Sequence, residues 1–222
     1  MSVPRKNKAE NSNQEIRQVT ASEPLSLKEE HEMQRSWCED ADKLTFIKCL
    51  PVSVETVQVI AGTDDAPVRL LGDVNLFLTS NNNNSDGNGD SYTSFGEIEL
   101  MIATKGKQGR GYGRAMLLAF MEYILTHQKD ILEEYDQGRL HSLNVHSRLA
   151  YLRARIAESN ERSIRLFESA WSSRVSTEAD YFGEVELRLV ASLSETLTSL
   201  GDKYCNPAYQ EVHYEHEVVE VQ

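Results

Sequence analysis

The chain has 222 residues, a formal net charge of -12 and an isoelectric point near 5.0. So acidic a composition argues against non-specific nucleic-acid binding, which depends on Lys and Arg side chains that neutralise phosphates. It suits a cationic, amine-bearing partner, although the charge also serves solubility alone. No apolar run approaches the ~20 residues that cross a bilayer. Because 40% of the residues are hydrophobic, we expect one domain with a buried core.

The three cysteines, Cys38, Cys49 and Cys205, are odd in number and lack the spacing of a metal site. Residues 1–14 are polar and have no apolar segment of the kind found in secretory signals. The sequence therefore predicts a protein without a bound metal in a reducing compartment. We expect the cytoplasm, with the nucleus as a second location.

In the first third of the chain, Ser26 and Glu29 have the spacing of a capping box. The helix that this box predicts places Met33 and Trp37 one turn apart, on the same face. Runs of β-branched and apolar residues then predict three strands, over residues 44–50, 52–60 and 68–79.

Residues 81–91 are almost wholly Asn, Ser, Asp and Gly, and they predict a flexible hairpin loop. A strand over residues 95–103 follows, and an apolar stripe with the helical period predicts a helix from Gly111. Residues 128–148 are polar and indicate an insertion without regular structure. A strand over 151–156, a short helix through Ile164 and Phe167, and a strand over 183–190 complete the pattern.

The order of these elements predicts an α/β fold with a mixed sheet (α+β). We expect one domain over residues 20–192. A disordered polar arm over residues 1–19 precedes it, and an acidic tail over residues 193–222 follows it.

The most informative stretch joins the strand at 95–103 to a glycine-rich turn, Gln-Gly-Arg-Gly-Tyr-Gly-Arg, at residues 108–114. N–H groups of a first helical turn lack intrahelical acceptors, and the helix dipole makes this end positive. Glycines let an anion approach, so the turn predicts a pyrophosphate site. The spacing fits neither a Walker A loop nor G-x-G-x-x-G; a plain left-handed turn is the alternative. Local positive charge comes from Lys105, Lys107, Arg110 and Arg114.

Gln108, Gly111 and Gly113 resemble the acetyl-CoA loop of GNAT acetyltransferases, whose pattern is Gln/Arg-x-x-Gly-x-Gly/Ala. Residues 160–167, Asn-Glu-Arg-Ser-Ile-Arg-Leu-Phe, resemble the second signature of that superfamily. More specific blocks resemble the eukaryotic N-acetyltransferase 9-like proteins; they cover residues 20–25, 33–37, 39–43, 72–78, 96–103 and 186–189.

The resemblance implies a GNAT fold and an N-acetyltransferase that takes acetyl from acetyl-CoA. The implied acceptor is an amine, at a protein N-terminus or on a lysine, and a cytoskeletal partner is implied by the resemblance alone. Residues implied to bind the donor are Met101, Ile102, Ala103, Gln108, Gly109, Arg110, Gly111, Tyr112, Gly113, Arg114, Asn160 and Ser163. For Asn160, the alternative role is that of N-cap for the helix that follows.

Three features depart from the resembled pattern. Family members begin with a strand and a helix before the block at residues 20–25, where this chain has only a short polar arm, so we expect a fold without them. Phe167 stands where many of these enzymes have a tyrosine that protonates the departing thiolate, which leaves solvent as the acid. Trp171 and Ser172 replace a common Gly-Phe pair. These departures keep open an alternative: a catalytically impaired GNAT-like protein that binds acyl-CoA or a protein partner.

Acetyl transfer to an amine needs a base for the ammonium proton and donors for the oxyanion. Glu97, Glu99 and Met101 alternate onto one face of the predicted strand. Either Glu97 or Glu99 is therefore the expected base, acting directly or through a water. The alternative is that these carboxylates only face solvent at the sheet edge.

Overall fold

A computed structural model describes residues 26–53, 55–81, 91–139, 146–171, 175, 178–189, 192–204 and 209–215. Its helices are α2 (Leu27–Glu39), α3 (Tyr112–Arg139), α4 (Glu161–Trp171) and α5 (Leu193–Tyr204), with the short 3-10 helices η1 (Pro67–Arg69) and η2 (Lys105–Lys107). Its strands are β1 (Lys43–Cys49), β2 (Gln58–Ile60), β3 (Leu70–Asn81), β4 (Ser91–Ile102), β5 (His146–Ala157), β6 (Glu184–Leu189) and β7 (His213–Glu215).

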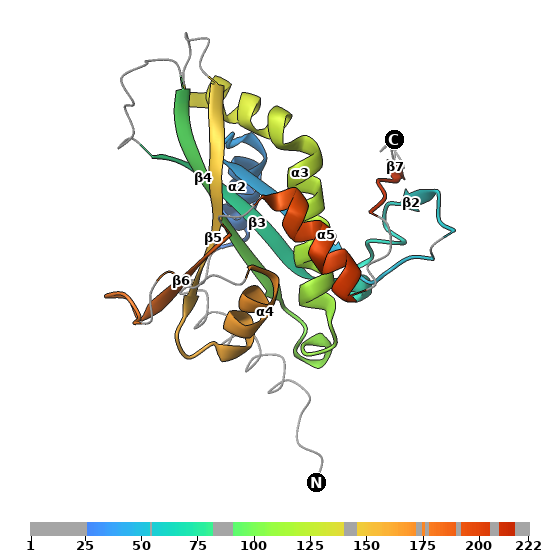
Figure 1. The fold of residues 1–222 in the computed structure, drawn as a ribbon. Coiled ribbons are helices and arrows are strands. Elements are labelled where there is room, and N and C mark those ends of the chain that lie inside the picture. Colours follow the sequence, from blue (N-terminus) through green and yellow to red (C-terminus); the bar gives the residue numbers. More distant parts are fainter. Residues whose placement is uncertain are drawn as a thin grey trace.

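Five strands form one sheet in the order β1-β3-β4-β5-β6 (Figure 1). The β4–β5 pair is parallel, and the other neighbours are antiparallel. A parallel pair needs a crossover connection, and α3 lies on the segment that provides it. The expectation of a mixed α/β sheet is therefore confirmed. β2 and β7 form a separate, two-stranded parallel ladder.

Strand alternation gives the sheet a core face and a polar face. In β6, for example, Val185, Leu187 and Leu189 are buried, while the residues between them are only half-buried. On the core face, α3 contacts β3, β4 and β5, α4 contacts β5 and β6, and α5 packs on α3 and α4. On the polar face, α2 contacts β1. The polar face holds most of the charged residues of the central strands.

The capping box at the start of α2 is confirmed. The Ser26 N–H donates to Glu29 Oε2 at 2.7 Å, and the Glu29 N–H donates to Ser26 Oγ at 3.3 Å. A strand over the whole of residues 52–60 is wrong, because only Gln58–Ile60 pairs with another strand. Just before β2 the chain turns instead, with the Thr56 N–H donating to the Ser53 carbonyl.

The prediction of an irregular insertion over residues 128–148 is wrong wherever the structure describes that stretch. Helix α3 continues to Arg139, and β5 already begins at His146. The buried stripe of the helix continues with Ile131, Leu132 and Tyr135. The apolar residues thus keep the helical period, although the segment is polar on average. Asp136, also buried, accepts the Ser147 N–H at 2.7 Å. This bond ties the end of α3 to the start of β5.

The prediction of a tail over residues 193–222 is also wrong in part. Residues 193–204 form α5, and residues 213–215 form β7. Leu200 is only 5% exposed and belongs to the main hydrophobic core, with Leu197 packed against it. The folded unit therefore continues past residue 192. Three predictions concern residues that the structure does not describe: the polar arm at 1–19, a fold without the first strand and helix, and residues 82–90 of the Asn-rich loop.

The packing of α5 gives a test of stability. We expect Leu200→Ala to lower the free energy of unfolding by about 2–4 kcal/mol, because it removes a buried side chain and leaves a cavity. Thr198→Ala, at an exposed position of the same helix, should change it by less than about 0.5 kcal/mol. Urea unfolding followed by circular dichroism measures both. Equal, small effects would mean that α5 does not pack on the core.

Candidate active site

The ladder between β4 and β5 ends halfway along both strands. The two strands pair from Ser91 and His146 as far as Glu97 and Arg153. Beyond that point β4 stays paired with β3 and β5 stays paired with β6. We call the unpaired stretch, residues 98–102 against residues 154–157, the β4–β5 split. An extra residue in β5, Ala150, precedes it opposite the Ser94–Phe95 step, and such bulges increase the local twist.

Backbone groups of β4 face the split. The Ala103 N–H donates to the Leu71 carbonyl at 2.8 Å, which fixes the side of the strand that bonds to β3. Because ladder bonds alternate along a strand, the N–H and C=O groups of Leu100 and Ile102 lie on the other side, toward β5. The split therefore offers an extended ligand the N–H groups of Leu100 and Ile102 and the Leu100 C=O, because the Ile102 C=O already accepts a side-chain N–H.

The glycine-rich turn lies directly beyond the split and begins α3. Gly109 and Gly111 have φ values of 72° and 87°, which non-glycine residues adopt at a cost of about 1–2 kcal/mol. The Gly111 carbonyl accepts the Ala115 N–H at 3.0 Å, so the first α-helical bond starts there. At Gly113, an added Cβ would lie 3.4 Å from Leu166 of α4. The three glycines thus serve the turn and the close packing of two helices.

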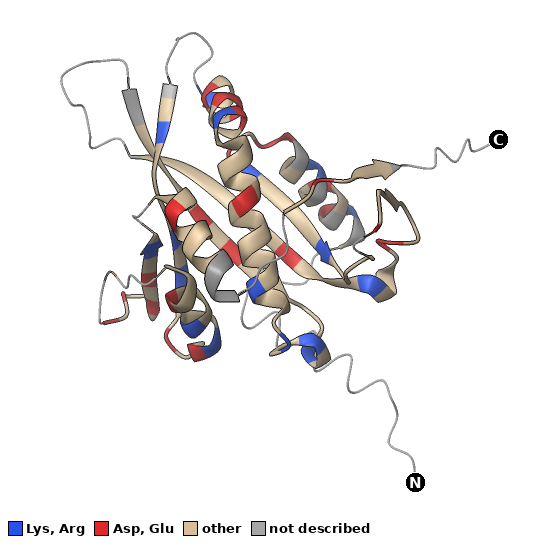
Figure 2. Cartoon of the chain, turned by 45° about the vertical axis from the view of Figure 1, so that its right-hand side comes forward, with Lys and Arg blue, Asp and Glu red and all other residues tan. Residues whose placement is uncertain are grey.

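Basic side chains surround this turn. Figure 2 shows Lys and Arg residues in the loop below the lower end of α3. Gln108 connects this loop to its neighbours: its Nε2 donates to the Ile102 carbonyl at 2.9 Å, and its Oε1 accepts Arg162 Nη1 at 3.4 Å. Arg162 belongs to the first turn of α4. Two helix N-termini and their arginines therefore converge at one end of the split.

Asn160 acts as the N-cap of α4. Its Oδ1 accepts the Ser163 N–H at 3.2 Å, and its carbonyl accepts the Ile164 N–H at 3.1 Å. The alternative role of Asn160, that of N-cap for α4, is therefore confirmed, and the N-cap bond uses the side-chain oxygen. Phe167 is 3% exposed and packs edge-on against Trp171, with ring centroids 4.7 Å apart. It is a core residue of α4.

The two candidate bases have different surroundings. Glu97 is held by Arg153, whose Nη2 lies 2.6 Å from Glu97 Oε2 and whose Nε donates to the same oxygen at 2.7 Å. Arg153 also lies 3.6 Å from a carboxylate oxygen of Glu186 and over the Phe95 ring. These two guanidinium N–H groups both contact the same carboxylate oxygen of Glu97, which leaves that oxygen little room for a further donor. Glu97 therefore positions Arg153 better than it deprotonates an amine.

Glu99 has the properties of a base. Residue Glu99 is exposed to solvent. Partial desolvation nevertheless raises the pKa of its carboxyl group, and repulsion from Glu97 raises it further. Lys43 acts in the opposite direction. A carboxylate with a raised pKa, reachable from solvent and next to the split, is suited to accept an ammonium proton.

Several polar-face residues near Glu99 were not among the site residues predicted from the sequence. Lys43 Nζ lies 3.7 Å from the centroid of the Trp37 ring and 4.8 Å from that of Phe77. Asp73 has a pKa raised by burial and accepts Asn75 Nδ2 at 2.9 Å. The alternating positions of β3 could have indicated that Asp73, Asn75 and Phe77 share one face. They could not have indicated that β4, with Glu99, is the neighbouring strand.

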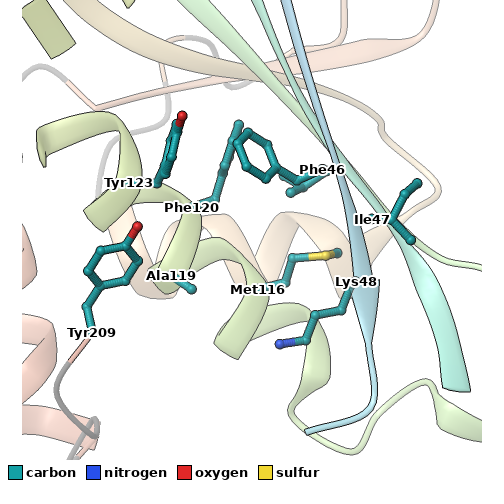
Figure 3. A pocket seen from close by; sticks show the side chains of 9 residues that line it. Phe46, Ile47, Lys48, Met116, Ala119, Phe120, Tyr123 and Tyr209 are labelled. Atoms are coloured by element: carbon teal, nitrogen blue, oxygen red, sulfur yellow. The ribbon is translucent and has the colours of Figure 1, made fainter. Parts of the chain in front are cut away.

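A pocket of about 170 Å³ lies elsewhere, between β1 and α3 on the core side of the sheet (Figure 3). Its lining is mostly apolar and aromatic, with the Lys48 ammonium pointing into the same space; the residues are Phe46, Ile47, Lys48, Val74, Met116, Ala119, Phe120, Tyr123 and Tyr209. Glu99 faces the opposite side of the sheet. This pocket is therefore separate from the candidate site.

Comparison with known proteins shows the family of the chain. A family model described as an acetyltransferase (GNAT) domain matches residues 8–170. This chain belongs to the GNAT acetyltransferase family. A human relative named alpha/beta-tubulin-N-acetyltransferase 9 is 37% identical over 182 residues, which cover 82% of this chain and 72% of the relative. An N-acetyltransferase 9-like protein of Schizosaccharomyces pombe is 34% identical over 200 residues, covering 80% and 84%.

Among solved structures, a spermidine N-acetyltransferase chimera from Vibrio cholerae aligns with a TM-score of 0.46 and 18% identity, over 88% of this chain and 96% of that one. From the family and its named relatives, this GNAT member is an N-acetyltransferase, an enzyme that transfers an acetyl group to an amine. Within the described residues, no cluster of His, Cys, Asp and Glu could hold a metal ion, and no helix is long and apolar enough to span a membrane.

Proposed function

We propose that this GNAT enzyme transfers the acetyl group of acetyl-CoA to an amino group of a protein in the cytoplasm. The observation that carries the proposal is the β4–β5 split, which ends at the glycine turn of α3 and borders Glu99 on the polar face. Acetyl-CoA combines a pyrophosphate, an extended amide-bearing arm and a thioester. The chain presents a matching group for each of the three.

The residues of this chain would hold the donor as follows. N–H groups at the start of α3 and the arginines of the turn bind the pyrophosphate. The outward N–H groups of Leu100 and Ile102 and the outward C=O of Leu100 bond to the amides of the arm, as a strand would. When bound, the donor supplies a thioester carbonyl that an amine can attack.

Glu99 takes the proton of the acceptor ammonium, which makes the nitrogen a nucleophile. A backbone N–H group of the split, turned toward the carbonyl oxygen, stabilises the charge that develops there. Because Phe167 is buried and has no proton to give, solvent protonates the departing thiolate.

The acidic surface and the named relatives favour a protein acceptor. At a net charge of -12, the enzyme attracts segments that carry ammonium groups. The human relative is named for α/β-tubulin, so tubulin is our proposed acceptor.

The test is an assay with acetyl-CoA and synthetic peptides of the α- and β-tubulin N-termini. We expect acetylation of peptides with a free amino group, and none of matched peptides whose amino group is already acetylated and which lack lysine. Mass spectrometry locates the product. Transfer to spermidine but to no peptide would contradict a protein acceptor, and failure to bind acetyl-CoA would contradict the donor.

A further inference from the structure

Lys43 is a primary amine that the fold places on the polar face, close to the candidate base. It opens β1 opposite Phe77 of β3, which in turn lies opposite Glu97 of β4. Its ammonium lies over the ring of Phe77, and the strand that carries this ring, β3, is the neighbour of β4. Glu99 is the next residue of β4 on this face. Lys43 and Glu99 therefore share the polar face, with one strand, β3, between their own strands.

The surroundings of Lys43 favour a reactive nitrogen. Trp37 and Phe77 cover the ammonium, and desolvation lowers its pKa despite attraction from Glu99, Asp40, Asp73 and Asp42. Within the described part of the chain, no carboxylate lies within 4.0 Å of the Lys43 nitrogen. The amine is thus held against two rings, and this cation–π attraction ends when the charge is lost.

We propose that Lys43 is an acetylation site of the enzyme itself. This inference rests on the proposed function, since the acetyl group comes from acetyl-CoA. Glu99 takes a proton from the Lys43 ammonium, and the neutral nitrogen attacks the thioester carbonyl. A C–N bond forms and the C–S bond breaks; the amine loses its second proton to solvent, and CoA leaves as the thiol. The product is a neutral amide on Lys43.

Lys48 provides a matched comparison in the same strand. Lys43 and Lys48 are five residues apart, so their side chains lie on opposite faces of β1, and Lys48 lines the core-side pocket. Burial lowers its pKa as well. Uncatalysed acetylation depends on the fraction of neutral amine and would modify both lysines, whereas catalysis at the β4–β5 split modifies Lys43 alone.

The experiment incubates the purified full-length protein with acetyl-CoA and maps acetylated lysines by mass spectrometry. We expect acetylation at Lys43 and not at Lys48, with a rate independent of protein concentration because the reaction is intramolecular. Glu99→Gln should slow it about 10²-fold or more, and Lys48→Arg should leave it unchanged. Acetylation of both lysines at rates that Glu99→Gln does not alter would overturn the inference.

A parallel reaction with acceptor peptides separates the two proposals. Acetylated peptides with unmodified Lys43 would overturn only the self-acetylation, while absence of both products would overturn the proposed function as well.

A readout without acetyl-CoA is the NMR signal of lysine labelled with ¹³C at Cε, assigned with Lys43→Arg. We expect the Lys43 signal to be shifted by the two rings and to titrate at lower pH than exposed lysines. Titration together with the exposed lysines would contradict the aromatic enclosure on which the inference depends.

Discussion

Replacing Glu99 with Gln is expected to lower acetyl transfer about 10²–10⁴-fold at neutral pH, the usual contribution of a general base. The amide cannot accept the ammonium proton but keeps the shape of the side chain, so affinity for acetyl-CoA should stay within about twofold. The loss should shrink at high pH, where the acceptor amine is already neutral. Initial rates from pH 6 to 10, with calorimetric titration of acetyl-CoA, measure both effects.

Glu97→Gln is the matched control, two residues away on the same face of β4. Its carboxylate is already bound by Arg153 at 2.6 Å, so we expect a smaller loss of rate that does not shrink at high pH. The sequence left both glutamates as candidate bases, and the structure distinguishes them by the ion pair of Glu97 and by the raised pKa of Glu99. Wild-type rates in Glu99→Gln at pH 7 would remove this residue from the mechanism.

The raised pKa of Glu99 gives the pH profile a defined sign. Below that pKa the carboxyl is protonated and accepts no proton, so activity should rise with pH through a value above the ordinary 4.5. Lys43 lowers the pKa of Glu99, so Lys43→Met should move this acid limb of kcat/KM to higher pH. A limb that stays in place would mean that the two groups do not interact.

The second large effect is expected for Gly111→Asp, which should weaken acetyl-CoA binding about 10²–10³-fold. An added carboxylate would face the pyrophosphate, and two unit charges 4 Å apart repel by about 4 kcal/mol at an effective dielectric constant of 20. The space at Gly111 is open, since no atom lies within 4 Å of an added Cβ. The folded structure can therefore hold the new side chain, and calorimetry measures the affinity.

Gly111→Asn is the control for backbone strain. It has the same size as Asp, and both adopt the φ of 87° with similar ease, so it differs only in charge. We expect it to keep most of the affinity. Equal affinity in the Asp variant and wild type would place the pyrophosphate elsewhere.

Local patterns in the sequence were sufficient to predict the start of α2 and the strand–turn–helix around Gly111. The capping box at Ser26 and the strand–turn–helix at Gly111 depend on neighbouring residues, and both are confirmed. The predictions failed where they relied on the polar average composition of a segment and overlooked the helical period of its few apolar residues. The end of α3 and helix α5 are polar on average, but Tyr135 and Leu200 are buried at helical spacing. The short strand β2 depends on β7, far along the chain, which no local pattern reveals.

In the candidate site, too, local patterns predicted some features, while others depend on tertiary structure. Strand alternation placed Glu97 and Glu99 on one face, as the structure does. The contact of Arg153 with Glu97, and that of Lys43 with Trp37 and Phe77, depend on the pairing of four strands and on the position of α2. Strand order and register are tertiary properties. Sequence alone therefore indicated which residues share a face, but not which carboxylate forms an ion pair with Arg153.

The central claim is that acetyl-CoA binds in the β4–β5 split, and amide NMR during a titration with CoA tests it most directly. We expect the largest shifts at Leu100, Ile102 and the residues of the turn, from Gly109 to Gly113. Signals of the core-side pocket, such as Phe46 and Lys48, should hardly move. Shifts centred on that pocket, with Leu100 and Gly111 unaffected, would contradict the placement of the donor and with it the assignment of Glu99 as the base.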